Sequence, residues 1–291
     1  MTALVTALEP RLVGPVTRAD FVRYAGAGGD FNPLHHDDDY ARGLGFPSVF
    51  AMGMWSAGLL GAYAADRLGI ERVRQFAVRF RAPVWPGDEL TIGLAEEQPD
   101  SEAMALVVSG VDGVRVSGTV RTTPSTAPPA DPGPSSPRLD EMRGYGFEDV
   151  EFPVERGKVG EFARAVRAES PVHHDRSAAE AAGFADLVAP PTFTDCVSHW
   201  SGGDATDVPI ALGLDLRRVL HGEQRYRLHR PIVAGDVLTV HRRVTDARTK
   251  PARGGGEMTL VTVTSEFLDT AGTTVVDEDM LIIQQPAKGT T

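Results

Sequence analysis

Residues 29–35 read Gly29-Asp30-Phe31-Asn32-Pro33-Leu34-His35 and place a carboxylic acid and an imidazole on either side of a proline-stiffened turn. Pro33 fixes its own φ and pushes Asn32 toward an extended conformation, so both polar side chains can face one small molecule. The same residue types also form ordinary turns, in which short polar side chains bond their own backbone. The stretch therefore indicates either a structural turn or a site of proton transfer.

The chain looks like a tandem duplication, because the turn and its surroundings occur twice. Each repeated segment keeps its internal spacing, and the histidine and glycine-phenylalanine pairs are displaced by the same interval. The matching segments are Pro33-Leu34-His35-His36-Asp37 and Pro171-Val172-His173-His174-Asp175, Gly45-Phe46 and Gly183-Phe184, and residues 83–90 and 231–238.

A proline-rich stretch separates the two copies. Residues 122–137 read TTPSTAPPADPGPSSP, which is too poor in apolar residues to pack a core. We therefore expect a first domain at residues 1–121, a Pro/Ser-rich linker at 122–145 and a second domain at 146–291.

The copies differ where chemistry would take place. The segment Phe162–Pro171 is three residues shorter than Phe21–Pro33, and nothing in it replaces the Gly29-Asp30 pair. At the place of Gly53 the second copy has Pro191, which has no backbone N–H to donate. We infer one competent half and one degenerate half.

Each copy is expected to form a short helix, the turn, a longer helix and an antiparallel sheet. In the first copy Thr17 is a plausible N-cap for a helix at 18–25, and 53–68 reads as a helix that is apolar on nearly every face. Further expected elements are a helical turn at 37–42, strands at 74–81, 89–95, 103–111 and 113–122, helical segments at 161–167, 175–182 and 191–200, and strands at 224–230, 237–245, 258–268 and 274–284.

The first half resembles the MaoC-like (R)-specific enoyl-thioester hydratases and dehydratases, a family with the hot-dog fold. The resemblance runs from about Thr17 to Leu60. It implies an α+β chain of two hot-dog units, each with an antiparallel sheet that wraps a long central helix. The residues that carry it, besides the turn itself, are Phe21, Tyr24, His36-Asp37, Ala41, Gly45-Phe46 and Gly53-Met54.

The chain as a whole resembles a fusion of the two subunits of the mycobacterial-type 3-hydroxyacyl-carrier-protein dehydratases. The first half resembles their catalytic subunit. The second half resembles the non-catalytic one, notably at residues 188–193 and 230–236. This likeness implies a pseudo-symmetric double hot dog, in which the degenerate half makes room for a longer acyl chain.

The family resemblance implies reversible hydration of trans-2-enoyl thioesters, or dehydration of (3R)-3-hydroxyacyl thioesters, by a hydro-lyase. By that resemblance Asp30 and His35 hold the water, and the backbone N–H at Gly53 points at the thioester oxygen. Asn32 would be a supporting residue that orients Asp30 or the loop. Neither metal nor cofactor is expected.

Several residues are expected to shape the substrate pocket. Where relatives commonly have His-Gly-Met-Leu, this chain has Met52-Gly53-Met54-Trp55, so Met54 and Trp55 could reshape the acyl pocket. In the second half His173 has no carboxylate partner, and a structural or acyl-lining role is expected for it.

The net charge of −11 argues against a nucleic-acid partner. Local basic groups still occur at Arg79 and Arg81 in the first half and at Arg217 and Arg218 in the second. They are either solvated faces of strands or the receptors for the phosphates of coenzyme A or of an acyl carrier protein. The expected partner is such an acyl thioester.

A soluble cytoplasmic protein is the simplest expectation. The uncharged stretch 43–65 is interrupted by proline, serine and glycine, so a membrane span is not expected. The amino terminus does not read as a signal peptide, and the single Cys196 agrees with a reducing compartment. A pair of chains could associate as a homodimer.

Two other functions stay open. A hot-dog thioesterase would use the same fold, although the helix at 53–68 offers only Asp66, near its end, as a separate carboxylate. A non-catalytic protein that binds acyl thioesters would fit if Met52 and the degenerate half signalled decay. Acyl chain length and pathway are not readable from the sequence.

Overall fold

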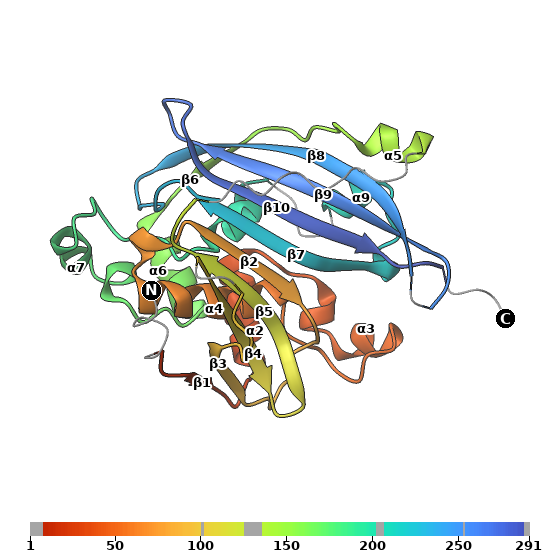
Figure 1. Ribbon diagram of the computed structural model, residues 1–291, viewed down its shortest axis with the longest axis horizontal. Coiled ribbons are helices and arrows are strands. Elements are labelled where there is room, and N and C mark those ends of the chain that lie inside the picture. The colour runs from red at the N-terminus through yellow and green to blue at the C-terminus, as the bar shows by residue number, and fades with distance from the viewer. Residues whose placement is uncertain (1–7, 100–101, 125–135, 202–206, 253, 288–291) are drawn as a thin grey trace.

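The computed structural model describes residues 8–99, 102–124, 136–201, 207–252 and 254–287. Within them ten strands form one antiparallel sheet in the order β1-β3-β4-β5-β2-β7-β10-β9-β8-β6 (Figure 1). The strands are β1 Arg11–Val13, β2 Gln75–Phe80, β3 Leu90–Leu94, β4 Ala103–Gly110, β5 Gly113–Arg121, β6 Val150–Pro153, β7 Val219–Leu228, β8 Val237–Pro251, β9 Glu257–Leu268 and β10 Thr274–Gln284.

The two halves of the chain repeat one topology. Strands β1-β3-β4-β5-β2 of the first half correspond, in reverse order across the sheet, to β7-β10-β9-β8-β6 of the second. The halves join where β2 pairs antiparallel with β7, with Ala77 opposite Arg225. The duplication inferred from the sequence is thus visible as two sheets that continue into each other across this seam (Figure 1).

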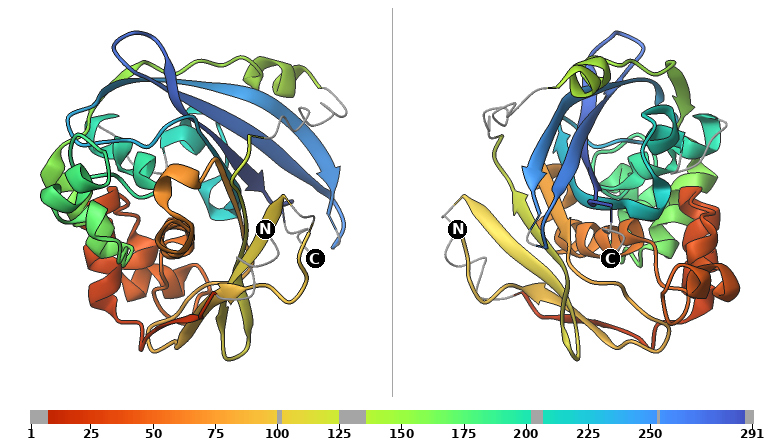
Figure 2. Two further views of the ribbon diagram at one scale, coloured as in Figure 1. Left: turned by 60° about the vertical axis from the view of Figure 1, so that its left-hand side comes forward. Right: turned by 90° about the vertical axis from the view of Figure 1, so that its right-hand side faces the viewer.

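Helices gather on one side of the sheet, where α2 of the first half packs against α6 of the second (Figure 2). Those of the first half are α2 Arg18–Gly28, η1 Pro33–His35, α3 Asp38–Gly43, α4 Gly53–Leu68 and η2 Ile70–Arg72. Those of the second half are α5 Pro137–Met142, α6 Arg156–Ala165, η3 Pro171–His173, α7 Arg176–Ala181, η4 Phe193–Val197, α8 Ser198–Ser201, α9 Asp207–Ala211 and η5 Leu216–Arg218.

Local chemistry sets the ends of α2. Thr17 and Asp20 form a capping box, in which each side chain bonds the backbone of the other. At the other end Gly29 has φ 81° and closes the helix through its N–H to the carbonyl of Ala25. A side chain at Gly29 would also collide with Ser198 of the second half, whose Oγ lies 2.3 Å from the position of a Cβ. The loop that carries Asp30 therefore starts at a fixed point.

Helix α4 has the bounds expected from the sequence and lies in the core. Nearly all its residues are buried, because it is apolar on nearly every face and the sheet of the first half covers it. Among the described residues of the second half no helix of this length follows. The expected helix at 191–200 is instead the 3₁₀ segment η4 followed by the one-turn α8. The expectation of one long helix there was wrong, and the two prolines at its start do not explain this, because the N–H groups of a first helical turn have no partner within the helix anyway.

Several short elements were not predicted from the sequence. The edge strands β1 and β6 were not expected, and α5 lies inside the segment assigned to the linker. Leu139 and Met142 of α5 pack into a small apolar cluster of the second half, so the packed part of that half begins earlier than residue 146. The central part of the linker, residues 125–135, lies outside the described residues, and the domain boundaries stay a prediction.

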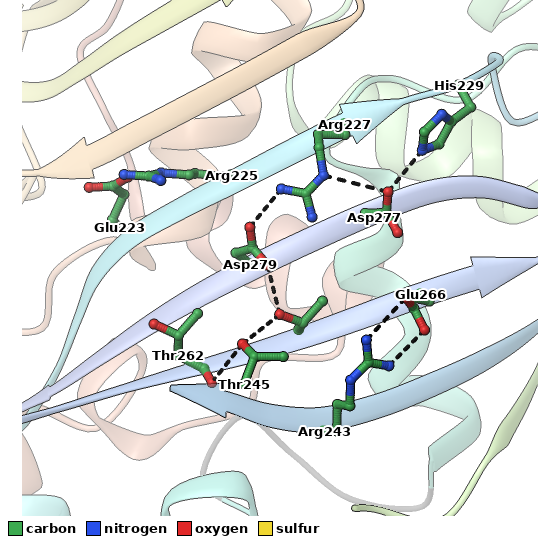
Figure 3. A network of polar contacts seen from close by, with 11 residues as sticks. Glu223, Arg225, Arg227, His229, Arg243, Thr245, Thr262, Glu266, Asp277 and Asp279 are labelled. Carbon is green, nitrogen blue, oxygen red and sulfur yellow. Dashed lines mark hydrogen bonds and ion pairs between the residues drawn. The ribbon is translucent and has the colours of Figure 1, made fainter. Parts of the chain in front are cut away.

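Arginines and carboxylates alternate along the second sheet, as Figure 3 shows for its strands β7 to β10. Arg227 lies between Asp279, with Nη1 to Oδ2 at 2.8 Å, and Asp277, with Nε to Oδ2 at 3.5 Å. Arg243 bonds both carboxylate oxygens of Glu266. This pattern is typical of a solvated sheet face. Within the described ranges no helix is both long enough and apolar enough to cross a bilayer.

Candidate active site

Asp30 and His35 come together as the turn predicts. The Nε2 atom of His35 lies 3.7 Å from Oδ2 of Asp30, which is too long for a good direct hydrogen bond. A water placed about 2.8 Å from each atom would fit beside the line that joins them. Both side chains are largely buried, with 8% of His35 and 18% of Asp30 exposed. The pair is therefore sheltered, and Asp30 is the more exposed of the two.

A backbone contact fixes the protonation pattern of His35 in its neutral form. Its Nδ1 lies 2.8 Å from the carbonyl oxygen of Phe50, and a carbonyl can only accept a hydrogen bond. The Nδ1 atom must therefore carry the proton, which leaves a lone pair on Nε2, the atom that faces Asp30. An imidazole held this way can take a proton from a water molecule.

The turn between the two residues is held by its own polar groups. The side chain of Asn32 accepts from the N–H of Leu34 and caps η1, while the N–H of Asn32 donates to Oδ1 of Asp30 at 3.1 Å. Asn32 thus shapes the loop with its side chain and contacts Asp30 only through its backbone. The ordinary turn chemistry and the paired acid and imidazole exist together in one segment.

Gly53 is the first residue of α4. It is exposed, although most of the helix that follows is buried. Met52 precedes it and makes no side-chain cap, so N–H groups of the first turn are available to an outside acceptor. The ring of Phe80 lies against this glycine, 3.1 Å from where a Cβ would be. The amino end of a 16-residue helix at this place suits a group that gains negative charge.

Phe50 and Trp85 beside His35 were given no role from the sequence, and Phe46 was noted only as part of the family motif. Phe50 packs edge-on against the imidazole, with ring centroids 5.3 Å apart, and contacts Phe46 at 4.8 Å and Trp85 at 5.6 Å. No spacing rule joins these residues, since Trp85 comes from the segment before β3. They form an apolar wall next to the polar pair.

The equivalent place in the second half is closed. His173 has its Nδ1 2.6 Å from the carbonyl oxygen of Val188, but it is fully buried and its Nε2 has no hydrogen-bond partner. Burial lowers the pKa of this imidazole. Asp66 of α4 lies nearby and is held by Arg11, at 2.9 Å, and by the N–H groups of Glu169 and Ser170. Asp66 is thus a structural carboxylate.

The residues expected to line an acyl pocket, Met54, Trp55 and His173, are all buried. Trp55 is fully buried, and its indole N–H donates to the carbonyl of Ala165 at 3.1 Å, which ties the two halves together. Met54 is 8% exposed and His173 not at all. Their positions favour packing over contact with substrate.

The arginines considered for phosphate binding are mostly paired. Arg79 donates to Glu223 across the β2–β7 seam at 2.7 Å, and both Arg217 and Arg218 bond Asp215. The two arginines lower the pKa of Asp215. Arg81 is exposed, and its Nε donates to the hydroxyl of Ser117. Among these four, Arg81 is therefore the residue best placed to meet an anion.

Two family models match separate stretches of the chain. Residues 3–116 match the model described as MaoC like domain, and residues 141–278 match the model described as FAS1-like, dehydratase domain region. A UPF0336 protein of Thermobifida fusca (strain YX) is 40% identical over 146 residues, which cover 50% of this chain and 92% of that protein. One from Parafrankia sp. (strain EAN1pec) is 43% identical over 129 residues, covering 44% and 82%.

Solved structures share the whole architecture. A MaoC domain protein dehydratase from Chloroflexus aurantiacus J-10-fl superposes with a TM-score of 0.63 and 15% identity, covering 96% of this chain and 94% of its own. A Mycobacterium tuberculosis protein described as a double hotdog gives 0.61 and 13%, covering 97% and 98%. The expected fold is confirmed. The chain belongs to the MaoC-like dehydratase family and is built as a double hot dog.

Proposed function

We propose that the chain catalyses the reversible, (R)-specific hydration of trans-2-enoyl thioesters of coenzyme A or an acyl carrier protein. The observation that carries this is the Asp30–His35 pair, with Nε2 and Oδ2 3.7 Å apart, in a half that matches a MaoC-like domain. The family match supports a hydratase or dehydratase activity. The substrate class and the stereochemistry belong to the proposal.

The proposed reaction adds the elements of water across the double bond. The oxygen of the water attacks the β-carbon, one of its protons passes to the Asp30–His35 pair, and a proton is delivered to the α-carbon. In the transition state negative charge gathers on the thioester oxygen. The N–H groups at Gly53, at the start of α4, would stabilise that charge. Dehydration follows the same steps in reverse.

The proposed substrate carries phosphates, which an arginine could receive. Arg81 is the candidate for contact with a phosphate, since Arg79, Arg217 and Arg218 already pair with carboxylates. Association of two chains into a dimer stays a prediction.

The test is an assay of the purified full chain on crotonyl-CoA. We expect loss of the conjugated double bond, formation of 3-hydroxybutyryl-CoA of (R) configuration and no release of free thiol. Replacing Asp30 by Asn removes the carboxylate with little change in shape and should lower kcat/KM by about 100-fold or more. Release of free thiol would instead indicate a thioesterase. Near-normal hydration by the Asp30→Asn variant would refute the assignment.

A further inference from the structure

The second half grips the segment that leads into Asp30. The hydroxyl of Ser198 donates to the carbonyl of Gly28 at 2.8 Å, and the thiol of Cys196 contacts the carbonyl of Ala27 at 3.1 Å. Nε2 of His199 lies 3.3 Å from the same Ala27 carbonyl. These side chains come from η4 and α8, the short segments that stand where a long helix was expected. The segments η4 and α8 therefore pack against the carboxyl end of α2.

One carboxylate of η4 reaches the same place. Tyr24 of α2 donates its hydroxyl to Oδ2 of Asp195 at 2.6 Å, and the ring of Tyr24 is fully buried. Gly28 leaves room for this carboxylate, because a Cβ there would lie 3.3 Å from Oδ2. Asp195 is thus packed against the chain two residues before Asp30, although it belongs to the other half.

The surroundings of Asp195 disfavour its charge. Burial, helped by the negative charges of Asp30 and Glu278, raises the pKa of Asp195 to about 7 against the opposing effect of the Tyr24 hydrogen bond. The side chain keeps some solvent contact. Its titratable neighbours are Tyr24 on α2, Asp30 in the loop, Tyr226 on β7, Glu278 on β10 and Cys196 on η4 itself.

We propose that Asp195 is a positioning residue for the Asp30–His35 pair, supplied by the degenerate half. With Tyr24 it fixes the end of α2, and in its protonated form it spares Asp30 a second negative charge alongside. The inference rests on the proposed function, because it assigns Asp195 to that reaction. The second half then contributes to catalysis as well as to the fold.

The proposal predicts a specific loss of activity at alkaline pH. When Asp195 ionises, a second negative charge stands beside Asp30 while the substrate gains negative charge, so kcat/KM falls. An Asp195→Asn variant keeps the shape and an oxygen that can accept from Tyr24, but it cannot ionise. At pH 8.5 only about 1 in 30 carboxyls with a pKa near 7 is protonated, so this variant should exceed the wild type by up to about 30-fold there. At pH 6 the two should agree within about twofold.

A second variant tests the sign. The Tyr24 hydrogen bond favours the ionised carboxylate, so Tyr24→Phe should raise the pKa of Asp195 and move the alkaline limb of kcat/KM to higher pH. A uniform loss of kcat at every pH in both variants, with the limb unmoved, would show a merely structural contact and overturn the proposal.

A measurement without substrate separates this inference from the proposed function. The pKa of Asp195 is higher in the fold than in the unfolded chain, so its contribution to stability is present below about pH 4 and is lost as pH rises through 7. The Tm of Asp195→Asn relative to wild type should therefore be higher at pH 8 than at pH 5. Equal differences at both pH values would contradict the assigned environment. A wild type that fails to hydrate any enoyl thioester would refute the function whatever the Tm shows.

Discussion

His35 and His173 occupy equivalent places in the two halves, yet only one of them faces a carboxylate. Each follows a proline in a 3₁₀ turn, and each holds its Nδ1 against a carbonyl, that of Phe50 or that of Val188. The Nε2 atom of His35 looks toward Asp30, whereas that of His173 is buried without a hydrogen-bond partner. The contact between Nδ1 and a backbone carbonyl is thus common to both halves. A catalytic site needs two further features, a carboxylate beside Nε2 and access for substrate.

The surroundings of the histidine turn also differ between the two halves. Close to the histidine turn of the second half, Arg11 and Asp66 of the first half form a buried ion pair, and the exposed Glu169 adds a second carboxylate to Arg11. In the first half the corresponding region receives Asp195 and Ser198 from the other copy. Each half therefore contributes side chains to the histidine region of the other. The second half supports the proposed catalytic site in the first, and the Arg11–Asp66 pair, called the brace below, stabilises the turn in the second.

The largest expected effect is the difference in kcat/KM between matched substitutions of the two histidines. His35→Gln should lower kcat/KM for crotonyl-CoA by about 10²–10⁴-fold, because it removes the group that exchanges protons with the water. The matched His173→Gln should change it less than about twofold, measured on folded protein as judged by circular dichroism. Equal losses in the two variants would mean that both halves react, or that neither does.

The next effect concerns stability. Asp66→Ala removes a carboxylate that holds Arg11 and two backbone N–H groups of the second half. It should cost about 3 kcal/mol in the free energy of unfolding, since it leaves a largely buried guanidinium with the exposed Glu169 and the carbonyl of Arg167 as partners. Denaturant unfolding measures this, with Glu169→Gln as the control at an exposed carboxylate. A cost below about 1 kcal/mol for Asp66→Ala would count against the brace.

A smaller effect depends on pH. Burial lowers the pKa of His173 below its unfolded value, so the unfolded chain binds this proton first and stability falls as pH drops below about 6.5. His173→Gln should weaken the acid-side loss by about 1 kcal/mol between pH 7.5 and 5.5. Unfolding curves at the two pH values provide the check. An unchanged pH dependence would mean that His173 is not kept neutral by the fold.

Much of the architecture was readable because it is local or repeated. The bounds of α4 were predicted correctly, since it is apolar throughout and ends at Gly69. Thr17 was recognised as a cap and formed one. The edge strands β1 and β6 were missed because three or four residues carry too little pattern.

The site was only half readable. Asp30 and His35 lie in one turn, so spacing alone could pair them. The contact of Tyr24 with Asp195 joins residues 171 positions apart, and it depends on how the two halves pack. Asp195 stands on η4, where a long helix was expected, and neither this short segment nor its contact with α2 leaves a local signature.

Catalysis by the first half requires an enoyl thioester to bind beside Gly53 and His35. The most direct test is a crystal structure of the Asp30→Asn variant soaked with crotonyl-CoA, which should be turned over too slowly to be lost. We predict the thioester oxygen at the N–H groups of Gly53 and the β-carbon beside His35 Nε2. Density for the enoyl group beside His173, or at a place that reaches neither Gly53 nor His35, would contradict the assignment of chemistry to the first half.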